Sequence, residues 1–324
     1  MGLNIMFKRC YLLILLVFIL AGCSHQVQKP PVAETKSAPR STTQNRPVTA
    51  FNQVDVQGRI NVHLHTGYKK PQVILTGDPR DLAQVKTVVT QNTLYVVLGN
   101  GYPRYGAVNA DIRGRFLNGF HYVGAGTIRG QRLHTSYLDL YLENQGTTRL
   151  AGTLGLQKLK IVGSGLTQID GISSRNLRIY LKGNPKVQLT GFSNLAKLNI
   201  NGDAWLSLYW IKSNNLTVRA RNASKVQLAG VVNRLDVELW GTSQFKGRYL
   251  RAQRSFVKTH DKSVAEISAV NHQSNLATDA SDIYYFNIPV TRADFMAYSG
   301  SVLDMREWSQ FDMQDFNRYN KQFP

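Results

Sequence analysis

A repeat with a period near 20 residues is the feature that most constrains the fold of this chain. The phrase NPKVQLTG at residues 184–191 returns as ASKVQLAG at residues 223–230, 39 positions later. Apolar and polar residues alternate within such lines, which is typical of a half-buried β-strand, and Gly, Asn, Ser or Asp then mark a turn. The lines begin at Leu138, Leu159, Leu177, Leu198, Leu216 and Leu235, at spacings of 21, 18, 21, 18 and 19 residues. Strands at this period without helices predict a β-solenoid.

The two copies of the phrase predict which side chains face the interior. If one coil takes about 20 residues, 39 residues are two coils, and equivalent residues lie above one another. Val187 and Val226 are expected to point inward, where burial of each side chain contributes roughly 1.5–3 kcal/mol. Lys186 and Lys225 are expected to point outward. We therefore assign the periodic apolar residues to the core and expect no cofactor.

The two ends of the predicted stack differ from its coils. Residues 50–119 contain alternating stretches and a short helical or looped segment, DPRDLAQVKTVV. They are expected to form a β-rich N-terminal cap, because an open solenoid end exposes sheet edges and apolar core. Residues 120–305 are expected to form the coils, and the aromatic-rich residues 306–324 the opposite cap. The predicted fold class is thus all-β, a parallel β-helix with a cap at each end.

The first 23 residues have the features of a lipoprotein signal peptide. Lys8 and Arg9 precede ten apolar residues, 11–20, which are too few for a membrane span of about 20 residues but suit a signal peptide. The segment LAGC at residues 20–23 resembles the lipobox of bacterial lipoproteins, in which the cysteine is lipidated and becomes the new N-terminus. The alternative interpretation is a short uncleaved anchor with a chance cysteine.

The lipobox resemblance makes Cys23 the predicted lipidation site. More than one acyl chain gives stable anchoring, so we expect the membrane to be a partner through this lipid. Ser24 stands where inner-membrane lipoproteins carry Asp, and resemblance to that sorting rule implies the outer membrane of a Gram-negative bacterium. Residues 24–49, rich in Pro, Ser, Thr, Gln and Lys, are predicted to be a flexible tether. Cys10 leaves with the signal peptide, so we expect no disulfide.

Several phrases in the middle of the chain resemble the GIN-domain family, described as the head domain of auto-transporter adhesins, with no agreed activity. They are VILTGDPRDLAQVKTVVTQNTLYVVL (73–98), VGAGTIRG (123–130), VGSGLTQIDG (162–171), NASKVQLAG (222–230) and YSGSVLDM (298–305). The resemblance covers residues 51–305 and implies a right-handed parallel β-helix in a protein of the cell envelope. The phrases LKGNPKV and ELWGTSQF depart from the family pattern. The resemblance implies no catalytic residue.

The sequence does not predict an active site. When the coils are aligned on their starting leucines, no outward position carries acids on two adjacent coils, so the paired carboxylates of glycoside hydrolysis are not indicated. Asp236 and Glu238 alternate on one strand face and are interpreted as solvated charge. His63 and His65 also share one face, but a lone pair without a third ligand is weak evidence for a metal. We expect no catalytic residue and no metal.

Basic charge is the remaining signal. The chain carries a formal charge of +19, and residues 158–262 hold 18 Lys and Arg against 5 Asp and Glu. Residues 263–324 hold 4 Lys and Arg against 8 Asp and Glu. A basic face can keep a repetitive sheet soluble, or it can attract acidic glycans and lipopolysaccharide phosphates. Both interpretations stay open, whereas nucleic acid is not expected because no binding motif occurs.

The candidate anion- and glycan-binding residues are cations with aromatic rings that could stack on sugars. They are Arg219, Arg221, Arg248, Arg251, Arg254, Lys258, Lys262, Tyr180, Trp210 and Trp240. Our leading hypothesis is an outer-membrane-anchored lipoprotein whose non-catalytic β-helix is an adhesive, scaffolding or polymer-binding surface. The alternative is a lyase-like polysaccharide-active enzyme that uses Arg and Lys with a lone carboxylate or Tyr. An envelope protein is a further possible partner.

Replacement of the predicted lipidation site gives a direct test. Cys23→Ser should leave the chain unacylated and uncut by the lipoprotein peptidase, because the thiol is the acceptor of the diacylglycerol. Metabolic labelling with a fatty acid and detergent partitioning measure both effects. Normal processing and membrane partitioning of this variant would contradict the lipoprotein interpretation.

Overall fold

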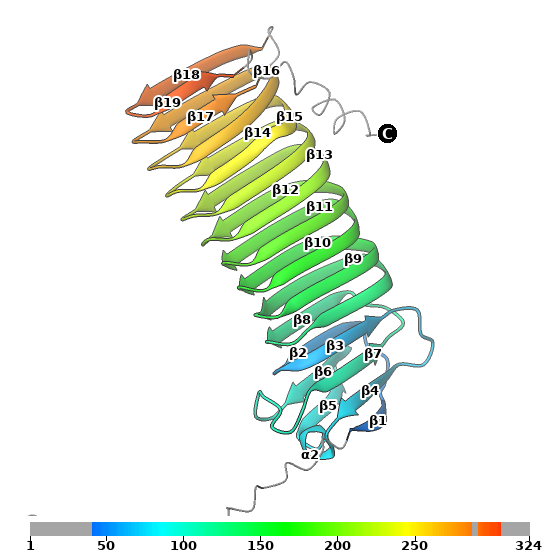
Figure 1. The fold of residues 1–324 in the computed structure, drawn as a ribbon. Coiled ribbons are helices and arrows are strands. Elements are labelled where there is room, and N and C mark those ends of the chain that lie inside the picture. Colours follow the sequence, from blue (N-terminus) through cyan, green and yellow to red (C-terminus); the bar gives the residue numbers. More distant parts are fainter. Residues whose placement is uncertain (1–40, 287–290, 306–324) are drawn as a thin grey trace, which may run out of the picture. The chain divides into compact units, whose positions relative to one another are not determined.

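A computed structural model describes residues 41–286 and 291–305, and this part of the chain consists almost entirely of β-strands (Figure 1). The strands are β1 (Thr42–Pro47), β2 (Gln53–Gln57), β3 (Ile60–His65), β4 (Gln72–Gly77), β5 (Val85–Thr90), β6 (Thr93–Leu98), β7 (Val108–Arg113), β8 (Gly119–Gly124), β9 (Ile128–Asn144), β10 (Thr147–Gly163), β11 (Leu166–Gly183), β12 (Lys186–Asn201), β13 (Trp205–Arg221), β14 (Lys225–Leu239), β15 (Gln244–Thr259), β16 (Val264–Thr278), β17 (Asp282–Tyr285), β18 (Arg292–Tyr298) and β19 (Ser301–Asp304), and a short helix is α2 (Pro79–Leu82).

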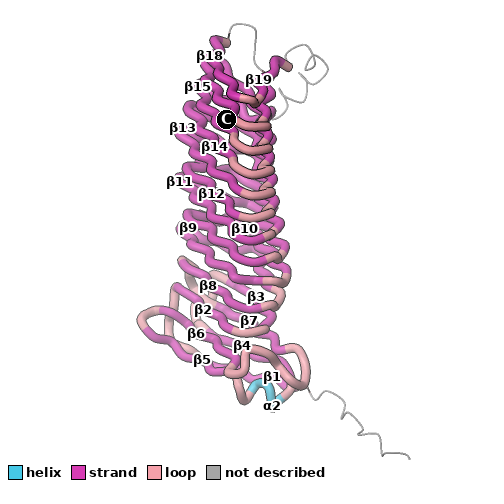
Figure 2. Tube along the Cα trace, turned by 90° about the vertical axis from the view of Figure 1, so that its left-hand side faces the viewer, coloured by secondary structure: helices cyan, strands magenta, loops and turns pink. Residues whose placement is uncertain are grey.

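The strands β9 to β16 are the coils of a parallel β-helix (Figure 2). Each is one long bent strand that makes most of a coil and pairs in parallel with the strand before and after it. Lys186 aligns with Trp205, and Trp205 aligns with Lys225, so the two copies of the repeated phrase lie two coils apart. The predicted solenoid is confirmed.

Stacked apolar side chains fill the interior of the coils. Val187 aligns with Leu206, then with Val226 and Phe245, and each of these side chains is at most 1% exposed. Removal of this apolar surface from water is the main favourable contribution to the fold. Lys186 and Lys225, one residue away, are exposed, as the alternation predicts.

The structure corrects the alignment of two coils. Leu159 aligns with Leu140 and Ile179, and Leu198 aligns with Ile179 and Val218. The true steps through these five residues are therefore 19 and 20 in alternation, and the starts predicted at Leu159 and Leu198 lie two to three residues too far along the chain. Because inward side chains recur every second residue in a strand, a leucine two positions along fits the interior equally well.

The N-terminal end has an order that departs from the sequence. Strand β2 lies between β6 and β8, and β3 lies between β7 and β9, all in parallel. The chain thus builds the coil of β2 and β3 first, continues outward through β4 and β5, returns through β6 and β7, and then passes over the first coil into β8. Part of the predicted cap therefore belongs to the stack, and the antiparallel strands β1, β4 and β5 cover its end.

Residues 42–47 of the predicted tether are not a tether in the structure. They form β1, which pairs with β4 in antiparallel fashion. Arg46 fixes this edge strand, since its guanidinium donates to the carbonyl oxygens of Val85 at 2.5 Å and Leu82 at 3.1 Å. The composition missed β1 because the strand is held by hydrogen bonds rather than by apolar burial. Residues 24–40, like the signal peptide, lie outside the described residues.

The insert predicted at residues 78–89 is helical only in its first part, α2, whereas its residues from Val85 onward belong to the strand β5. The Asp78 side chain accepts a hydrogen bond from the Arg80 N–H at 3.0 Å and caps the helix, as an Asp at this position commonly does. Asp81 is buried, and its carboxylate accepts hydrogen bonds from the N–H groups of Arg104 and Tyr105, both at 2.8 Å. These bonds tie the loop before β7 to the helix.

The phrase VGAGTIRG marks the place where the chain passes over the first coil. The buried hydroxyl of Tyr122 donates to the Ile60 carbonyl at 3.0 Å and accepts from the Gly126 N–H at 2.6 Å. A Cβ atom at Gly126 would lie 2.1 Å from the same carbonyl oxygen, so the close approach of β3 requires glycine. Burial raises the pKa of Tyr122, which keeps the phenol protonated as a donor.

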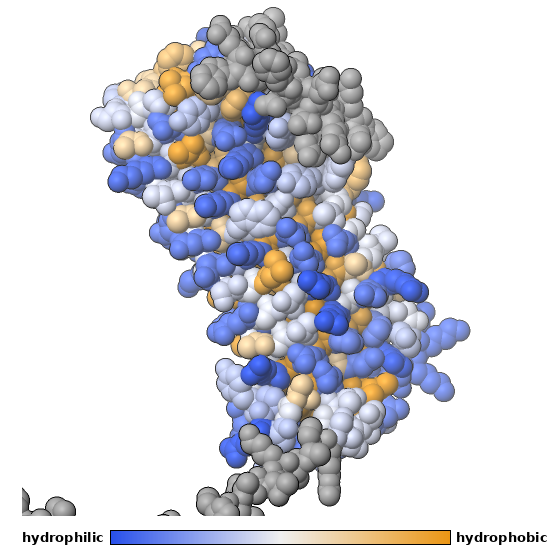
Figure 3. Space-filling view, in the orientation of Figure 1, coloured by the Kyte–Doolittle hydropathy of each residue, from blue (hydrophilic) through white to orange (hydrophobic). Residues whose placement is uncertain are grey.

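The opposite end of the stack exposes apolar side chains. Phe295, Met296 and Tyr298 of β18 and Leu303 of β19 are each at least 44% exposed, and Figure 3 shows apolar surface near this end. The predicted aromatic cap, residues 306–324, lies outside the described residues.

Substitution inside the stacked column should be far more destabilising than substitution beside it. Val187→Asp and Val226→Asp each place an unpaired carboxylate in the core, at an expected cost of several kcal/mol. Lys186→Ala and Lys225→Ala should change the free energy of unfolding by about 0.5 kcal/mol or less. Denaturant unfolding measures all four variants, and equal losses from the lysine changes would contradict the register.

Loss of the Tyr122 hydroxyl should destabilise the crossing point. Tyr122→Phe leaves the Gly126 N–H and the Ile60 carbonyl without this partner, at an expected cost of about 1–3 kcal/mol in the free energy of unfolding. The raised pKa means that this contribution is present below the unfolded pKa of about 10 and shrinks at higher pH, because the unfolded phenol ionises first. Tyr180→Phe is the matched control, and an equal loss in both variants would count against this role.

Candidate functional site

The outward residues of the second half of each coil form one surface, called here the groove face. Its central column runs through Tyr141, Lys160, Tyr180, Asn199, Arg219, Glu238 and Lys258. Alignment on the starting leucines would put Val162 and Asn201 in this column instead of Lys160 and Asn199, because the coils of Leu159 and Leu198 are shifted. In the observed alignment, Lys158, Arg178 and Lys197 lie in the next column. Basic residues of three successive coils are therefore neighbours, whereas alignment on the starting leucines does not place Lys197 beside Arg178.

A groove of about 720 Å³ lies in the middle of this face. Its lining includes Tyr180 and Trp240, which are half-buried, and Lys197 and Arg221, which are exposed. Neither Lys197 nor Arg221 forms an ion pair with any residue that the structure describes. The groove therefore combines flat aromatic surface with two cations whose charge is uncompensated.

Aromatic rings and cations stack along the axis of the coils beside this groove. The Arg221 guanidinium carbon lies 4.5 Å from the centre of the Trp240 ring, within the range of a cation–π contact. The other side of Trp240 stacks on His260, with ring centres 5.6 Å apart and planes at 19°. These contacts hold the indole and the guanidinium in place before any ligand arrives.

Arg219 differs from Arg221, although only two residues separate them. Its guanidinium contacts the carboxylate of Asp236 at 3.0 Å and that of Glu238 at 2.9 Å. The two acids that the sequence suggested were solvated charge are thus the partners of Arg219. Their charges offset that of the arginine, so Arg219 is a weaker candidate for anion binding than its position in the sequence suggested.

The structure brings together some of the sequence-predicted residues and separates others. Tyr180, Arg219, Arg221, Trp240 and Lys258 lie on the groove face.

The remaining candidates lie elsewhere on the coils. Arg248 lies at the bend of β15 with its guanidinium 4.4 Å from the Phe286 ring, and Trp210 lies at the bend of β13. Arg251 and Arg254 precede the groove face on β15, and Lys262 lies in the turn after it. Consecutive residues spread around the circumference of a coil, so the basic run at 246–262 does not form one patch.

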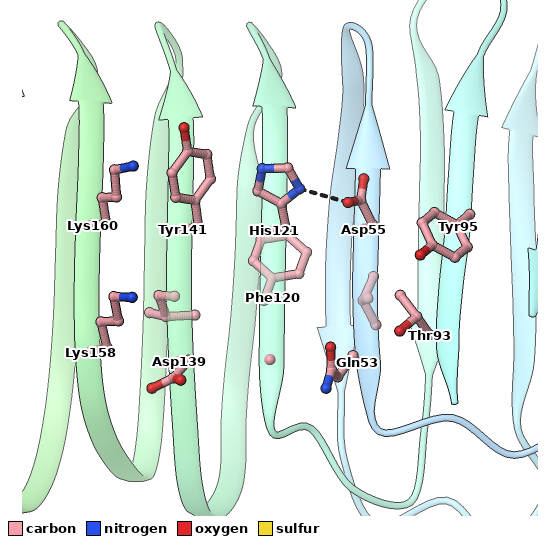
Figure 4. A pocket seen from close by; sticks show the side chains of 13 residues that line it. Gln53, Asp55, Thr93, Tyr95, Phe120, His121, Asp139, Tyr141, Lys158 and Lys160 are labelled. Carbon is pink, nitrogen blue, oxygen red and sulfur yellow. Dashed lines mark hydrogen bonds and ion pairs between the residues drawn. The ribbon is translucent and has the colours of Figure 1, made fainter. Parts of the chain in front are cut away.

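A second hollow of about 280 Å³ lies on the same face toward the N-terminal end (Figure 4). Asp55, His121, Tyr141, Lys158 and Lys160 line it, from the neighbouring strands β2, β8, β9 and β10. His121 Nδ1 and Asp55 Oδ2 are 2.6 Å apart. No sequence pattern points to this pair, since the two residues are 66 positions apart and meet only because the chain passes over its first coil.

Two acids do lie on adjacent coils, at the turns rather than on the groove face. Asp261 accepts a hydrogen bond from the Gly241 N–H at 2.8 Å, and Asp279 accepts one from the Asp261 N–H at 3.2 Å. The bond from the Asp261 N–H lowers the pKa of Asp279. These carboxylates stabilise turns and are not an acid/base pair.

The histidine pair of the sequence does not lie in a metal-binding cluster. His65 Nε2 is 3.5 Å from the Asp111 carboxylate. Among the residues that the structure describes, no three His, Cys, Asp or Glu side chains gather so that they could hold a metal ion. Within residues 41–286 and 291–305, no helix has both the length and the apolar character needed to cross a membrane.

A comparison with protein families gives a match over most of the chain. A family model described as "Putative auto-transporter adhesin, head GIN domain" matches residues 50–289. No curated protein sequence matches the chain.

Several solved structures are similar to this chain. One is titled "Putative lipid binding protein", from Parabacteroides distasonis, with 15% identity, coverage of 82% of this chain and 96% of that chain, and a TM-score of 0.46. A "putative adhesin" from the same species has 14% identity, coverage of 82% and 97%, and a TM-score of 0.47. Another, from Parabacteroides merdae, has 14% identity, coverage of 82% and 96%, and a TM-score of 0.45.

Proposed function

The chain belongs to the GIN head-domain family of auto-transporter adhesins, and we propose that it is a lipid-anchored adhesive head of the outer membrane whose groove face binds anionic saccharides. The ligand class is a sugar polymer that carries carboxylate or phosphate groups. The lipobox at Cys23 supports the anchor, and the family description supports the adhesive role at the cell envelope.

One observation carries the binding proposal: an exposed arginine stacked on a tryptophan inside a groove. The indole of Trp240 is stacked between Arg221 and His260, so it lines the groove with its edge, which is polar enough to remain partly wet. Arg221 lies at cation–π distance from that ring and keeps its planar fork of donors, which suits carboxylate and phosphate oxygens. A saccharide in the groove would therefore meet the cation with its anionic group.

The second cation of the groove extends this arrangement across neighbouring coils. Lys197 lines the same groove on the strand β12, and the half-buried ring of Tyr180 lines it on β11. Strands in a sheet are about 4.7–4.9 Å apart, so these side chains contact successive parts of a linear polymer that lies along the stack. The basic excess of residues 158–262 attracts such a polymer from a distance.

Hydrolysis is not supported at this groove. Glu238, which lines the groove, and Asp236, which lines a neighbouring hollow, are both bonded to Arg219, so neither carboxylate has the free role that each of the two acids has in a glycoside hydrolase. The groove is therefore a binding surface in this proposal.

Substitution of the groove residues should weaken binding without loss of stability. The double variant Lys197→Ala with Arg221→Ala is expected to bind a polyuronate or lipopolysaccharide at least about tenfold more weakly, since each charge-assisted contact is worth about 1.5–3 kcal/mol. Trp240→Ala should weaken binding at both low and physiological salt. Titration of the full chain in detergent against these ligands measures the affinities.

The matched control removes two lysines from a different face. Lys186→Ala with Lys225→Ala lowers the net charge by the same amount, but both residues lie outside the groove face. Wild-type affinity should also fall steeply with salt, because exposed charges are screened over about 8 Å at 0.15 M. Equal weakening in both double variants would mean that the basic charge serves solubility and not binding at the groove. Binding of an envelope protein without binding of any saccharide would contradict the proposal.

A further inference from the structure

In the second hollow, the carboxylate of Asp55 fixes the orientation of the His121 ring. Asp55 Oδ2 lies 2.6 Å from His121 Nδ1, and the side chains of Asp55 and His121 are 16% and 38% exposed. A carboxylate accepts and does not donate, so Nδ1 carries the proton and Nε2 of the neutral ring presents a lone pair. No residue that the structure describes is bonded to Nε2, and Figure 4 shows the ring between Asp55 and Tyr141.

A phenol lies beside this histidine on the next strand. The ring centres of His121 and Tyr141 are 4.5 Å apart, so one sugar ring placed over the pair would contact both. The Tyr141 hydroxyl has a weak contact with Glu143 Oε2 at 3.5 Å, longer than an ordinary hydrogen bond between oxygens. The hydroxyl therefore remains able to donate a proton to a ligand in the hollow.

Two lysines complete the hollow on the following strand. Lys160 Nζ lies 4.6 Å from the centre of the Tyr141 ring, and Lys158 points to the same face two residues earlier. Both are exposed, and neither forms an ion pair within the described part of the chain. A base, an acid and two cations thus lie on three adjacent strands, and a carboxylated sugar is the ligand that uses all of them.

We propose that this hollow cleaves polymers of 4-linked uronic acids by β-elimination. Lys158 and Lys160 neutralise the carboxylate of the uronate, which makes the neighbouring C5–H more acidic. His121 Nε2 takes the C5 proton, the electron pair of that bond forms the C4–C5 double bond, and the C4–O4 bond breaks. The departing O4 takes the proton of the Tyr141 hydroxyl, and solvent then returns a proton from His121 to Tyr141. No electrons are exchanged with an outside reagent, and no water is consumed.

This activity goes beyond the binding role of the groove and uses different residues. A His–Asp pair between strands could instead serve only to hold β2 against β8, but a purely structural pair would not need an open Nε2 beside a phenol and two lysines, which outnumber the one other carboxylate of the hollow, Asp139. Tyr141, Lys160 and Tyr180 follow one another in one column, so the hollow adjoins the groove. A polymer held at the groove would therefore reach the hollow within two coils.

The test uses the full chain in detergent with polygalacturonate, alginate and a glucuronate-containing polymer as substrates. The expected result is a product with an ultraviolet-absorbing unsaturated ring, formed in equal amount to the new reducing ends. His121→Asn keeps an amide that can bond to Asp55 but has no basic nitrogen, so kcat should fall about 10²–10⁴-fold with little change in KM. Tyr141→Phe should also lower kcat, and Lys158→Ala with Lys160→Ala should both raise KM and lower kcat, because the lysines bind the carboxylate and make C5–H more acidic.

Lys186→Ala, on another face of the coils, is the control that should retain wild-type turnover. If the His121→Asn variant does not fold, Tyr141→Phe still tests the proposal, because it removes only one hydroxyl from an outward ring. Absence of unsaturated product from all three polymers would overturn the proposal, as would reducing ends without unsaturation, which indicate hydrolysis. Full turnover by a folded His121→Asn protein would overturn the role of the histidine and with it the mechanism.

Discussion

The parallel, in-register pairing of successive coils is the constraint on which the rest of the structure depends. Each hydrogen-bonded neighbour places equivalent residues about 4.7–4.9 Å apart, so any residue type that recurs every 19 or 20 positions becomes a column through the protein. Inside, this rule stacks Val187 on Leu206 and Leu206 on Val226 and excludes water. Outside, it sets the same distance between cations, rings and carboxylates, and so decides which of them can interact.

The groove face shows how neighbours in a column change the chemistry of a residue. Arg219 and Arg221 have the same side chain and the same strand, but Arg219 meets two carboxylates on the next coil and Arg221 meets an indole. The charge of Arg219 is therefore offset by ion pairs within the protein, whereas the charge of Arg221 remains available to a ligand. A count of basic residues along the chain cannot separate these two cases.

At the N-terminal end, the crossing of the chain over its first coil creates contacts that the regular repeat does not have. It requires glycine at Gly126, where β3 approaches, and it buries the Tyr122 hydroxyl as a bridge to Ile60. The same crossing seats Asp55 of the first coil against His121 of the coil above it. One topological event thus explains a phrase typical of the family and also creates the second hollow.

The sequence by itself determined the solenoid, its period and which face of each strand is buried, because alternation and turn residues act locally: Val187 and Lys186 were assigned correctly from their neighbours alone. It did not determine the register of Leu159 and Leu198, since an inward leucine fits two positions of a strand with period 2. It missed β1, which is held by hydrogen bonds from residues such as Arg46 rather than by an apolar pattern. The placement of the basic residues around each coil and the meeting of Asp55 with His121 were decided by the tertiary structure, because they depend on where each bend falls and on which strand pairs with which. Both are contacts between residues distant in the chain, and no local pattern records them.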